Sequence, residues 1–293
     1  MKLATFVDGG HDRLGVVDTE RGVVVDVSSL VPEGGLLTAI EHWDTIRPQL
    51  EATLADLPGV PLDGVHLRAP IPVPRRNVFC VGKNYREHVA EFGRSGYDTA
   101  SRSEDVPTKA ILFSKATTSV TGPFDDVELH RAVTSEVDYE GELAVIIGRG
   151  GRGIARGEAL EHVWGYTILN DVTARDLQRD HKQWLLGKSL DTHCPMGPYA
   201  VTADEVGDVQ TLELETSVNG ERRQHAAVKD LIFDVAELIT TISAGITLLP
   251  GDVIATGTPA GVGIGFDPPR FLTSGDVVEV SISGLGTLRN RIA

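Results

Sequence analysis

The chain has 293 residues, of which 41% are hydrophobic and 24% charged, so it can bury a substantial core in one or two domains. Its formal net charge of −15 argues against nucleic acid and anionic membrane surfaces as partners. The only cysteines, Cys80 and Cys194, imply no disulfide framework and fit a reducing compartment.

The N-terminal sequence predicts several strands followed by a helix. Short strands are expected at 2–7, 12–18 and 22–27, separated by DGGHD and ERG turns. Residues 35–57 carry apolar residues near helical spacing, and Pro48 should break or kink that helix.

A proline-rich connector follows at 69–77, with the sequence APIPVPRRN. Its prolines favour an extended chain and mark the expected domain boundary. We therefore predict a small N-terminal α/β domain at 1–70 and a larger domain at 71–293. MKLATFVDGG lacks the apolar core of a signal peptide, and no apolar run approaches membrane-spanning length, so we expect a cytoplasmic protein.

The larger domain is mostly strand-like. Strands are expected at 77–82, 110–115, 142–148, 163–171, 211–220, 252–258 and 276–284. The best helical segments are 172–184 and 229–246. Many strands with few helices between them predict a β-rich α+β fold with a mixed or antiparallel sheet, not a doubly wound one. Residues 93–108 are polar and aperiodic, which is typical of a lid or a disordered segment.

Acidic residues alternate at the start of the predicted strand in SEVDYEGELAVIIG, 135–148. The alternation puts Asp138, Glu140 and Glu142 on one face, and the unbroken apolar run that follows predicts a strand covered on both faces. Carboxylates crowded at a buried strand end need a cation or must take up a proton. The alternative is an exposed strand end with solvated acids.

A further acid lies in LNDVTARDLQRDHKQW, 169–184. Asn170 or Asp171 could cap the helix predicted there, and Asp171, Arg175 and Gln178 would share one helix face. A cap with an intrahelical ion pair is the simpler interpretation. Combined with Glu140 and Glu142, however, Asp171 would complete an oxygen site suited to a hard divalent ion.

Three other stretches carry candidate chemistry. In CVGKNYREHVAEFG, 80–93, Glu91 could orient His88 and raise its basicity, although such a pair also occurs incidentally on helix surfaces. Lys188, in WLLGKSLDTHCPMGPYA, is either a solvated loop charge or a group that reaches a bound anion. TGTPAGVG, 256–263, offers backbone N–H groups and hydroxyls to an anion, or is a tight structural turn.

Taken together and in this order, these stretches resemble the successive signatures of the fumarylacetoacetate hydrolase family. The resemblance covers about residues 70–293, and the first 70 residues resemble the small variable domain of many bacterial members. It implies a mixed β-sandwich roll, usually assembled as a homodimer. One departure is FSKATTSV, 113–120, where Ala116 stands at a position that is often proline in relatives.

The resemblance also implies roles for individual residues. Glu140, Glu142 and Asp171 would hold Mg²⁺ or Mn²⁺, whereas Asp138 would not be a ligand. His88 and Glu91 would form a catalytic dyad on a segment that orders as a lid over substrate, with Lys188 as a further catalytic group. The residues expected to bind substrate are Arg175, Gln178, Thr258 and Tyr85.

The expected activity is metal-dependent hydrolysis of the C–C bond of an acylpyruvate-type 2,4-dioxo acid, such as fumarylpyruvate or acetylpyruvate. His88 would draw a proton from water, hydroxide would add to the distal carbonyl, and the metal would stabilise the departing pyruvate enolate. Lys188 would hold or protonate that enolate.

Two alternatives remain at this stage. One is decarboxylation or tautomerisation of a β-oxo diacid such as oxaloacetate, or the isomerase-decarboxylase reaction on 2-hydroxyhepta-2,4-diene-1,7-dioate in aromatic catabolism, both known within this family. The intact His88–Glu91 pair favours hydrolysis over these. The other is a non-catalytic binding protein, which predicts a broken dyad or missing ligands, whereas every motif position is intact.

Overall fold

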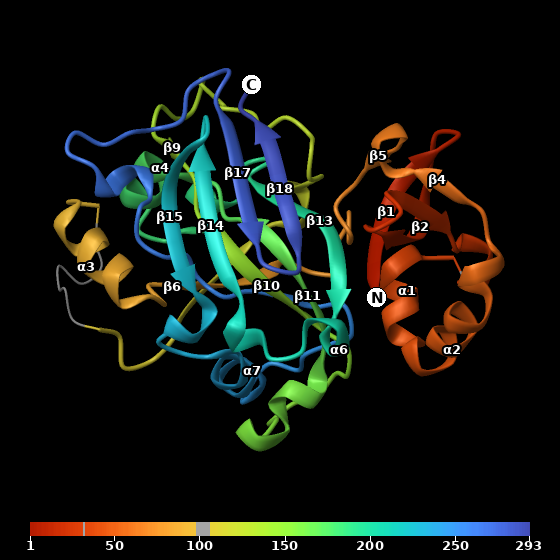
Figure 1. Ribbon diagram of the computed structural model, residues 1–293. Helices are drawn as coiled ribbons and strands as arrows, with labels where there is room; N and C mark the ends of the chain where they lie inside the picture. Colours follow the sequence, from red (N-terminus) through yellow and green to blue (C-terminus); the bar gives the residue numbers. More distant parts are fainter. Residues whose placement is uncertain (32, 98–105) are drawn as a thin grey trace.

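Two β-sheets packed on each other form the body of the molecule, with a smaller N-terminal part beside them (Figure 1). The computed structural model describes residues 1–31, 33–97 and 106–293. In the view of Figure 1 the smaller sheet lies in front of the central strands of the larger one.

The larger sheet contains twelve strands of the described chain. They are β1 (Lys2–Asp8), β2 (His11–Asp18), β3 (Val23–Asp26), β4 (Gly59–Pro61), β5 (His66–Leu67), β6 (Val78–Gly82), β7 (Ile111–Lys115), β8 (Val120–Thr121), β10 (Gly141–Ile147), β11 (Val163–Asn170), β13 (Cys194–Thr202) and β16 (Val253–Ala255). The main path is β4-β3-β2-β1-β13-β11-β10-β16-β6-β7, while β5 pairs with β1 and β8 with β13. Only β16–β6 and β13–β8 are parallel, which confirms the predicted mixed sheet.

The smaller sheet is fully antiparallel and has the strand order β15-β14-β17-β18. Its strands are β14 (Glu213–Val218), β15 (Glu221–Ala227), β17 (Val277–Ile282) and β18 (Gly286–Arg291). A separate short pair joins β9 (Val137–Asp138) to β12 (Thr173–Ala174).

Helices are short and lie around the sheets. They are α1 (Gly35–Glu41), α2 (Trp43–Thr53), α3 (Arg86–Arg94), α4 (Arg175–Asp180), α5 (Leu185–Lys188), α6 (Ala203–Val206) and α7 (Val235–Ser243). Single turns of 3₁₀ helix occur at Ser28–Leu30, Leu54–Asp56, Leu62–Gly64, Thr117–Ser119, Val209–Thr211, Val228–Asp230 and Gly263–Gly265, with a longer one at Arg156–His162. None of the helices in the described ranges is long and apolar enough to cross a membrane.

Strand β10 is buried along its whole length, as its unbroken apolar run predicts. Leu143, Val145 and Ile147 belong to the core that β14, β17 and α7 complete. Ala144 and Ile146 point to the opposite face and join a second core that includes α1 and α2. Alternate side chains of one strand therefore tie both layers together.

The N-terminal strands extend the larger sheet instead of forming a sheet of their own. β1 pairs with β13, and Leu3 lies opposite Ala200. This part of the chain therefore shares backbone hydrogen bonds with the rest of the molecule, although residues 69–77 connect it in a stretch that contains several bends and no regular structure, in place of the extended chain expected. The boundary between residues 70 and 71 stays a prediction.

The expected helix at 35–57 is divided at a different residue from the one predicted. His42 separates α1 from α2, and Pro48 lies inside α2. Proline removes only one helical hydrogen bond, and Ile46 and Leu50 on either side of Pro48 are buried, so packing holds this turn together. The helix expected at 229–246 is also shorter: α7 begins after Asp234, whose carboxylate accepts a hydrogen bond from the backbone N–H of Glu237.

His193, directly before β13, is completely buried. Its Nε2 donates to the carbonyl oxygen of Glu128 over 2.9 Å. Burial, helped by the charge of Lys115, lowers the pKa of His193 to about 3.

We predict that this histidine weakens the fold in mild acid. In the unfolded chain His193 titrates near pH 6.5. Below that pH the unfolded chain therefore binds a proton that the folded state does not bind. The contribution of His193 to the free energy of unfolding is therefore fully present above pH 6.5 and falls as the pH approaches 3. Between pH 7 and pH 5 the loss from this group is about 2 kcal/mol. Chemical denaturation at several pH values should show a shallower pH dependence for His193→Gln. The exposed control His225→Gln should behave as wild type, and equal slopes in both variants would contradict the prediction.

Candidate active site

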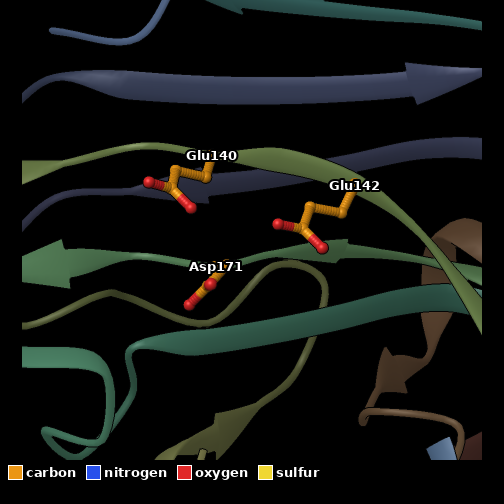
Figure 2. A group of neighbouring side chains, drawn as sticks. All are labelled: Glu140, Glu142 and Asp171. Atoms are coloured by element: carbon orange, nitrogen blue, oxygen red, sulfur yellow. The ribbon is translucent and has the colours of Figure 1, made fainter. Parts of the chain in front are cut away.

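The antiparallel pairing of β10 with β11 brings the acidic residues together. Gly141 lies opposite Asn170, and the backbone N–H of Asp171 donates to the carbonyl oxygen of Glu140 over 2.8 Å. Residues far apart in sequence therefore meet at the same end of two neighbouring strands. Figure 2 shows the carboxyl groups of Glu140 and Glu142 extending toward that of Asp171.

Glu140, Glu142 and Asp171 form a buried carboxylate triad. One oxygen from each lies within 4.8 Å of the others. Burial, followed by repulsion from Asp171 and Glu140, raises the pKa of Glu142 well above its ordinary value. Buried carboxylates at this spacing suit a hard divalent cation such as Mg²⁺ or Mn²⁺, which would relieve the repulsion. The triad therefore fits such an ion.

Two buried lysines contact the triad. Lys188 Nζ donates to Glu140 over 2.7 Å and to Asp171 over 2.8 Å. Lys115 Nζ donates to the other oxygen of Asp171 over 2.6 Å and to the carbonyl oxygen of Val172 over 3.0 Å. Burial alone would neutralise Lys188, but the carboxylates of Asp171 and Glu140 outweigh it and raise its pKa. Both oxygens of Asp171 thus face a lysine.

Arg175 forms ion pairs with carboxylates of the protein itself. Its Nε donates to Asp138 over 2.9 Å, and its Nη2 lies 2.7 Å from Glu140. Its Nη1 donates to Gln178 over 3.2 Å. The carboxylates of Glu140 and Asp138 outweigh the effect of burial and raise the pKa of Arg175. Asp138 is fully buried, and its place beside Arg175 shows that it is not an exposed acid.

The loop at 256–265 binds carboxylates of the protein itself. The backbone N–H of Gly257 donates to Glu142 over 2.7 Å, and that of Gly263 to Asp138 over 2.7 Å. The backbone N–H of Gly261 donates to Glu91 over 2.8 Å. The expectation that this loop presents its N–H groups to a bound anion is therefore wrong for these groups, because they already hold buried acids.

His88 and Glu91 form a close pair on α3. His88 Nδ1 lies 3.0 Å from Glu91 Oε2, and His88 is only 4% exposed. The other oxygen of Glu91 is the one that accepts from Gly261. A side chain at Gly265 would collide with Glu91, since its Cβ would lie 1.9 Å from Oε1. The dyad is thus anchored to the same loop that holds Glu142.

A small cavity lies between His88 of the dyad and Glu140 and Glu142 of the triad. Its wall includes Val81, Gly82, Lys83, His88, Phe92, Phe113, Glu140, Glu142, Arg175, Gln178, Trp184, Lys188 and Thr258. It leaves about 20 Å³ for the centres of water-sized molecules, which is room for about one water. A larger molecule can enter only if part of this wall moves. The segment 86–108, expected to be a lid, begins in this wall with α3, although its residues 98–105 lie outside the described ranges.

Several predicted site residues take positions different from those expected. Asp171 precedes the short strand β12 and does not cap a helix; α4 begins at Arg175. Asp171 therefore shares no helix face with Arg175 and Gln178, because its role in the sheet pairing keeps it extended. Tyr85 is not on the cavity wall: its side chain belongs to the hydrophobic core and borders a separate surface groove.

Thr258 does reach the cavity, but its hydroxyl is engaged within the protein. It donates to the carbonyl oxygen of Gly141 over 3.0 Å and accepts from Gln224 over 2.8 Å. Ala116 adopts φ −64° and ψ 148°, a conformation that proline also takes, so the loop keeps its shape without proline there. Its N–H donates to Ser189 over 2.9 Å, a bond that proline could not make.

Sequence reasoning did not single out Lys115, which contacts Asp171, or Lys83 and Trp184, which lie on the cavity wall. Lys115 ends β7, and a lysine at the end of an otherwise apolar strand was the available signal. Trp184 packs edge-on against Phe113, and a Cβ at Gly82 would lie 2.5 Å from its ring. The absence of a side chain at Gly82 thus lets Trp184 close the cavity. No local sequence pattern indicated that contact.

Family models match both parts of the chain. Residues 77–293 match the model described as the fumarylacetoacetate (FAA) hydrolase C-terminal domain, and residues 1–73 match fumarylacetoacetase N-terminal domain 2. The chain therefore belongs to the fumarylacetoacetate hydrolase family, and its fold is that of the family.

Individual relatives are named as enzymes. Oxaloacetate tautomerase YisK of Bacillus subtilis (strain 168) is 52% identical over 231 residues, which are 79% of this chain and 74% of that protein. The structure of fumarylacetoacetate hydrolase (EaFAH) from psychrophilic Exiguobacterium antarcticum is 46% identical, with a TM-score of 0.87 over 100% of this chain and 99% of that one. Maleylpyruvate hydrolase from Sphingobium sp. SYK-6, solved with manganese(II) and pyruvate, is 32% identical, with a TM-score of 0.82 and the same coverage. The present chain is thus an enzyme of this family.

We predict that Glu142→Gln weakens metal binding without destabilising the fold. Glutamine keeps the acceptor for the N–H of Gly257 but removes a negative charge from the triad. Affinity for Mn²⁺ should fall by more than about 100-fold, the upper end of the range for outer-shell partners. Unfolding free energy without metal should stay equal or rise, because repulsion within the triad is relieved.

Calorimetric titration with Mn²⁺ and chemical denaturation in EDTA measure the two quantities. Glu213→Gln, an exposed change on β14, is the matched control. Unchanged Mn²⁺ affinity in Glu142→Gln would exclude Glu142 as a ligand.

Proposed function

We propose that this protein is a divalent-metal-dependent tautomerase of a small 2-oxo dicarboxylate, with oxaloacetate as the model substrate. The observation that carries the proposal is that an oriented base, His88, shares one small cavity with Glu140 and Glu142 of the carboxylate triad. The 52% identity to an oxaloacetate tautomerase supports it. The relatives thus favour the tautomerase alternative over the acylpyruvate hydrolysis first expected.

Glu140, Glu142 and Asp171 would hold the metal. When bound, Mg²⁺ or Mn²⁺ would supply positive charge for the carboxylate and 2-oxo oxygens of the substrate. Lys188 and Lys115 keep the triad ordered: together they hold both oxygens of Asp171, and Lys188 also holds Glu140. Arg175 fixes Glu140 from a second side and places Gln178 on the cavity wall.

His88 is the group that moves the proton. Because Nδ1 donates to Glu91, the lone pair for proton transfer is on Nε2. In going from enol to ketone, oxaloacetate loses the proton of its 2-hydroxyl and gains one at C3. His88 Nε2 can take the proton of the 2-hydroxyl and return it at C3, while Glu91 balances the charge on the ring. Phe92, Phe113 and Trp184 form the aromatic part of the cavity wall.

C–C bond hydrolysis of an acylpyruvate is the second candidate. It is favoured by the similarity to maleylpyruvate hydrolase and by the intact dyad, which could equally draw a proton from water. Loss of enol absorbance from oxaloacetate, compared with loss of acylpyruvate absorbance under the same Mg²⁺ concentration, distinguishes the two. Faster turnover of acetylpyruvate would reverse our order of preference.

We predict that His88→Asn lowers tautomerisation by roughly 100- to 10,000-fold, the usual contribution of a positioned general base. Mn²⁺ affinity should stay close to wild type, because His88 belongs to the dyad and not to the triad. Glu91→Gln should lower the rate less, since glutamine can still meet the ring but carries no charge.

Stopped-flow absorbance on freshly dissolved enol, with calorimetry for the metal, provides both readouts. His130→Asn changes a histidine outside this cavity and serves as the control. Tautomerisation that continues at the wild-type rate in His88→Asn would remove His88 from the mechanism.

We also propose a homodimeric assembly in the cytoplasm, on the family resemblance. Sedimentation velocity at micromolar concentration should give twice the chain mass of 31.4 kDa. A single species at the monomer mass would contradict the proposed dimer.

A further inference from the structure

Three aromatic side chains form one continuous part of the cavity wall. Phe92 comes from α3, Phe113 from β7, and Trp184 from the position directly before α5. The Trp184 ring packs edge-on against Phe113 at a centroid distance of 5.1 Å and lies 6.4 Å from the Phe92 ring. A ligand that extends to this side of the cavity meets aromatic carbon.

Trp184 is fixed in this wall from two sides. A Cβ at Gly82 would lie 2.5 Å from Cζ3 of the indole, so the ring can lie here only because residue 82 has no side chain. The backbone carbonyl of Trp184 accepts a hydrogen bond from the N–H of Lys188 over 3.0 Å. Lys188 is itself tied to Glu140 and Asp171. The ring is thus held by the end of β6 and by a short helix that is anchored to the triad.

The indole also separates the cavity from solvent. Trp184 is half-buried, and the next two residues, Leu185 and Leu186, are 48% and 51% exposed. Phe92, by contrast, is only 4% exposed. Loss of the Phe92 ring would leave an internal void, whereas loss of the indole would open the cavity toward the surface. Trp184 therefore forms the outer limit of the space that a substrate can use.

We infer that Trp184, seated on Gly82, sets the greatest length of substrate that the site accepts and so selects short 2-oxo acids. The inference rests on the proposed function, in which the carboxylate and the 2-oxo group face the triad and C3 faces His88. The charged part of the wall is occupied by ion pairs, so an apolar tail gains contact only along the aromatic rings. A tail that reaches Trp184 must displace the indole from its seat, at a cost that a shorter tail avoids.

The competing explanation is structural: Trp184 serves only to hold α5, and with it Lys188, in place. The two roles differ in their effect on ligands. A structural role changes the affinity for every 2-oxo acid by the same factor, because Lys188 acts at the triad. A limit on length changes the affinity for long acids relative to short ones.

The test compares 2-oxobutyrate with 2-oxooctanoate, which share one head group and differ by four methylene groups. Both lack a second carboxylate, so calorimetry on Mn²⁺-loaded protein gives their dissociation constants without net turnover. Wild type should bind 2-oxobutyrate at least about 10-fold more tightly, the usual penalty for a tail too large for its pocket. In Trp184→Ala the ratio of the two dissociation constants should shift by at least about 10-fold toward 2-oxooctanoate, because each methylene buried in the vacated space contributes about fourfold.

Two further variants complete the design. Trp184→Phe keeps a smaller aromatic ring beside Gly82 and should give an intermediate ratio. Trp43→Ala is the matched control, because Trp43 is also half-buried and edge-on to another ring, that of Trp164 at 5.1 Å, but lies outside the cavity. Its ratio should equal that of wild type. If Trp184→Ala does not fold, as judged by thermal melting, Trp184→Leu replaces it.

No preference for 2-oxobutyrate in wild type, or an unchanged ratio in Trp184→Ala, overturns the inference. The proposed function is judged separately by enol turnover of oxaloacetate by wild type. A protein that selects short acids through Trp184 but does not tautomerise oxaloacetate would disprove the function and keep the inference. A protein that tautomerises oxaloacetate but binds both acids equally would do the opposite.

Discussion

The burial of several carboxylates at one end of β10 and β11 is the constraint on which the site depends. Asp138, Glu140, Glu142 and Asp171 are all removed from water within a few residues of one another. Buried carboxylates repel each other and lose hydration, so each must be compensated by a cation or by N–H donors. Much of the surrounding structure does this: Lys115, Lys188 and Arg175 provide charge, and the loop at 256–265 provides backbone donors.

That loop also links the base to the triad. Its N–H groups hold Glu142 on one side and Glu91 on the other, so the position of His88 relative to the triad depends on one short segment. The conformation needs glycine. At Gly261, where φ is 104°, a Cβ would lie 2.0 Å from the carbonyl oxygen of Arg223. A loop that looked suited to a substrate anion is therefore the scaffold of the site.

Local sequence patterns predicted much of the sheet but fewer of the helices. The apolar run of β10 gives that strand correctly, because a strand buried on both faces carries an unbroken apolar run. The N-terminal strands are given correctly by the turns that separate them. Strands β13, β15 and β18 were missed. β13 has two prolines and a glycine within Cys194–Thr202, which are unusual in a strand. The sequence of β15 is mostly polar because one face of the strand is exposed. The helices predicted around α4 and α7 are longer than those observed, because tertiary contacts end these helices earlier.

The sequence by itself determined the chemistry available: the acids of SEVDYEGEL, the acid at the end of the next strand, the His–Glu spacing and the lysines. Only the tertiary structure decided how these groups are used. Strand register brings Asp171 to Glu140, and backbone N–H groups from more than a hundred residues away hold Glu142. Arg175 turns out to be bound by Asp138 and Glu140, Tyr85 belongs to the core, and Lys83 lies in the cavity. The physical reason is that charge compensation in a buried site is a matter of distance in space, and sequence spacing does not report that distance.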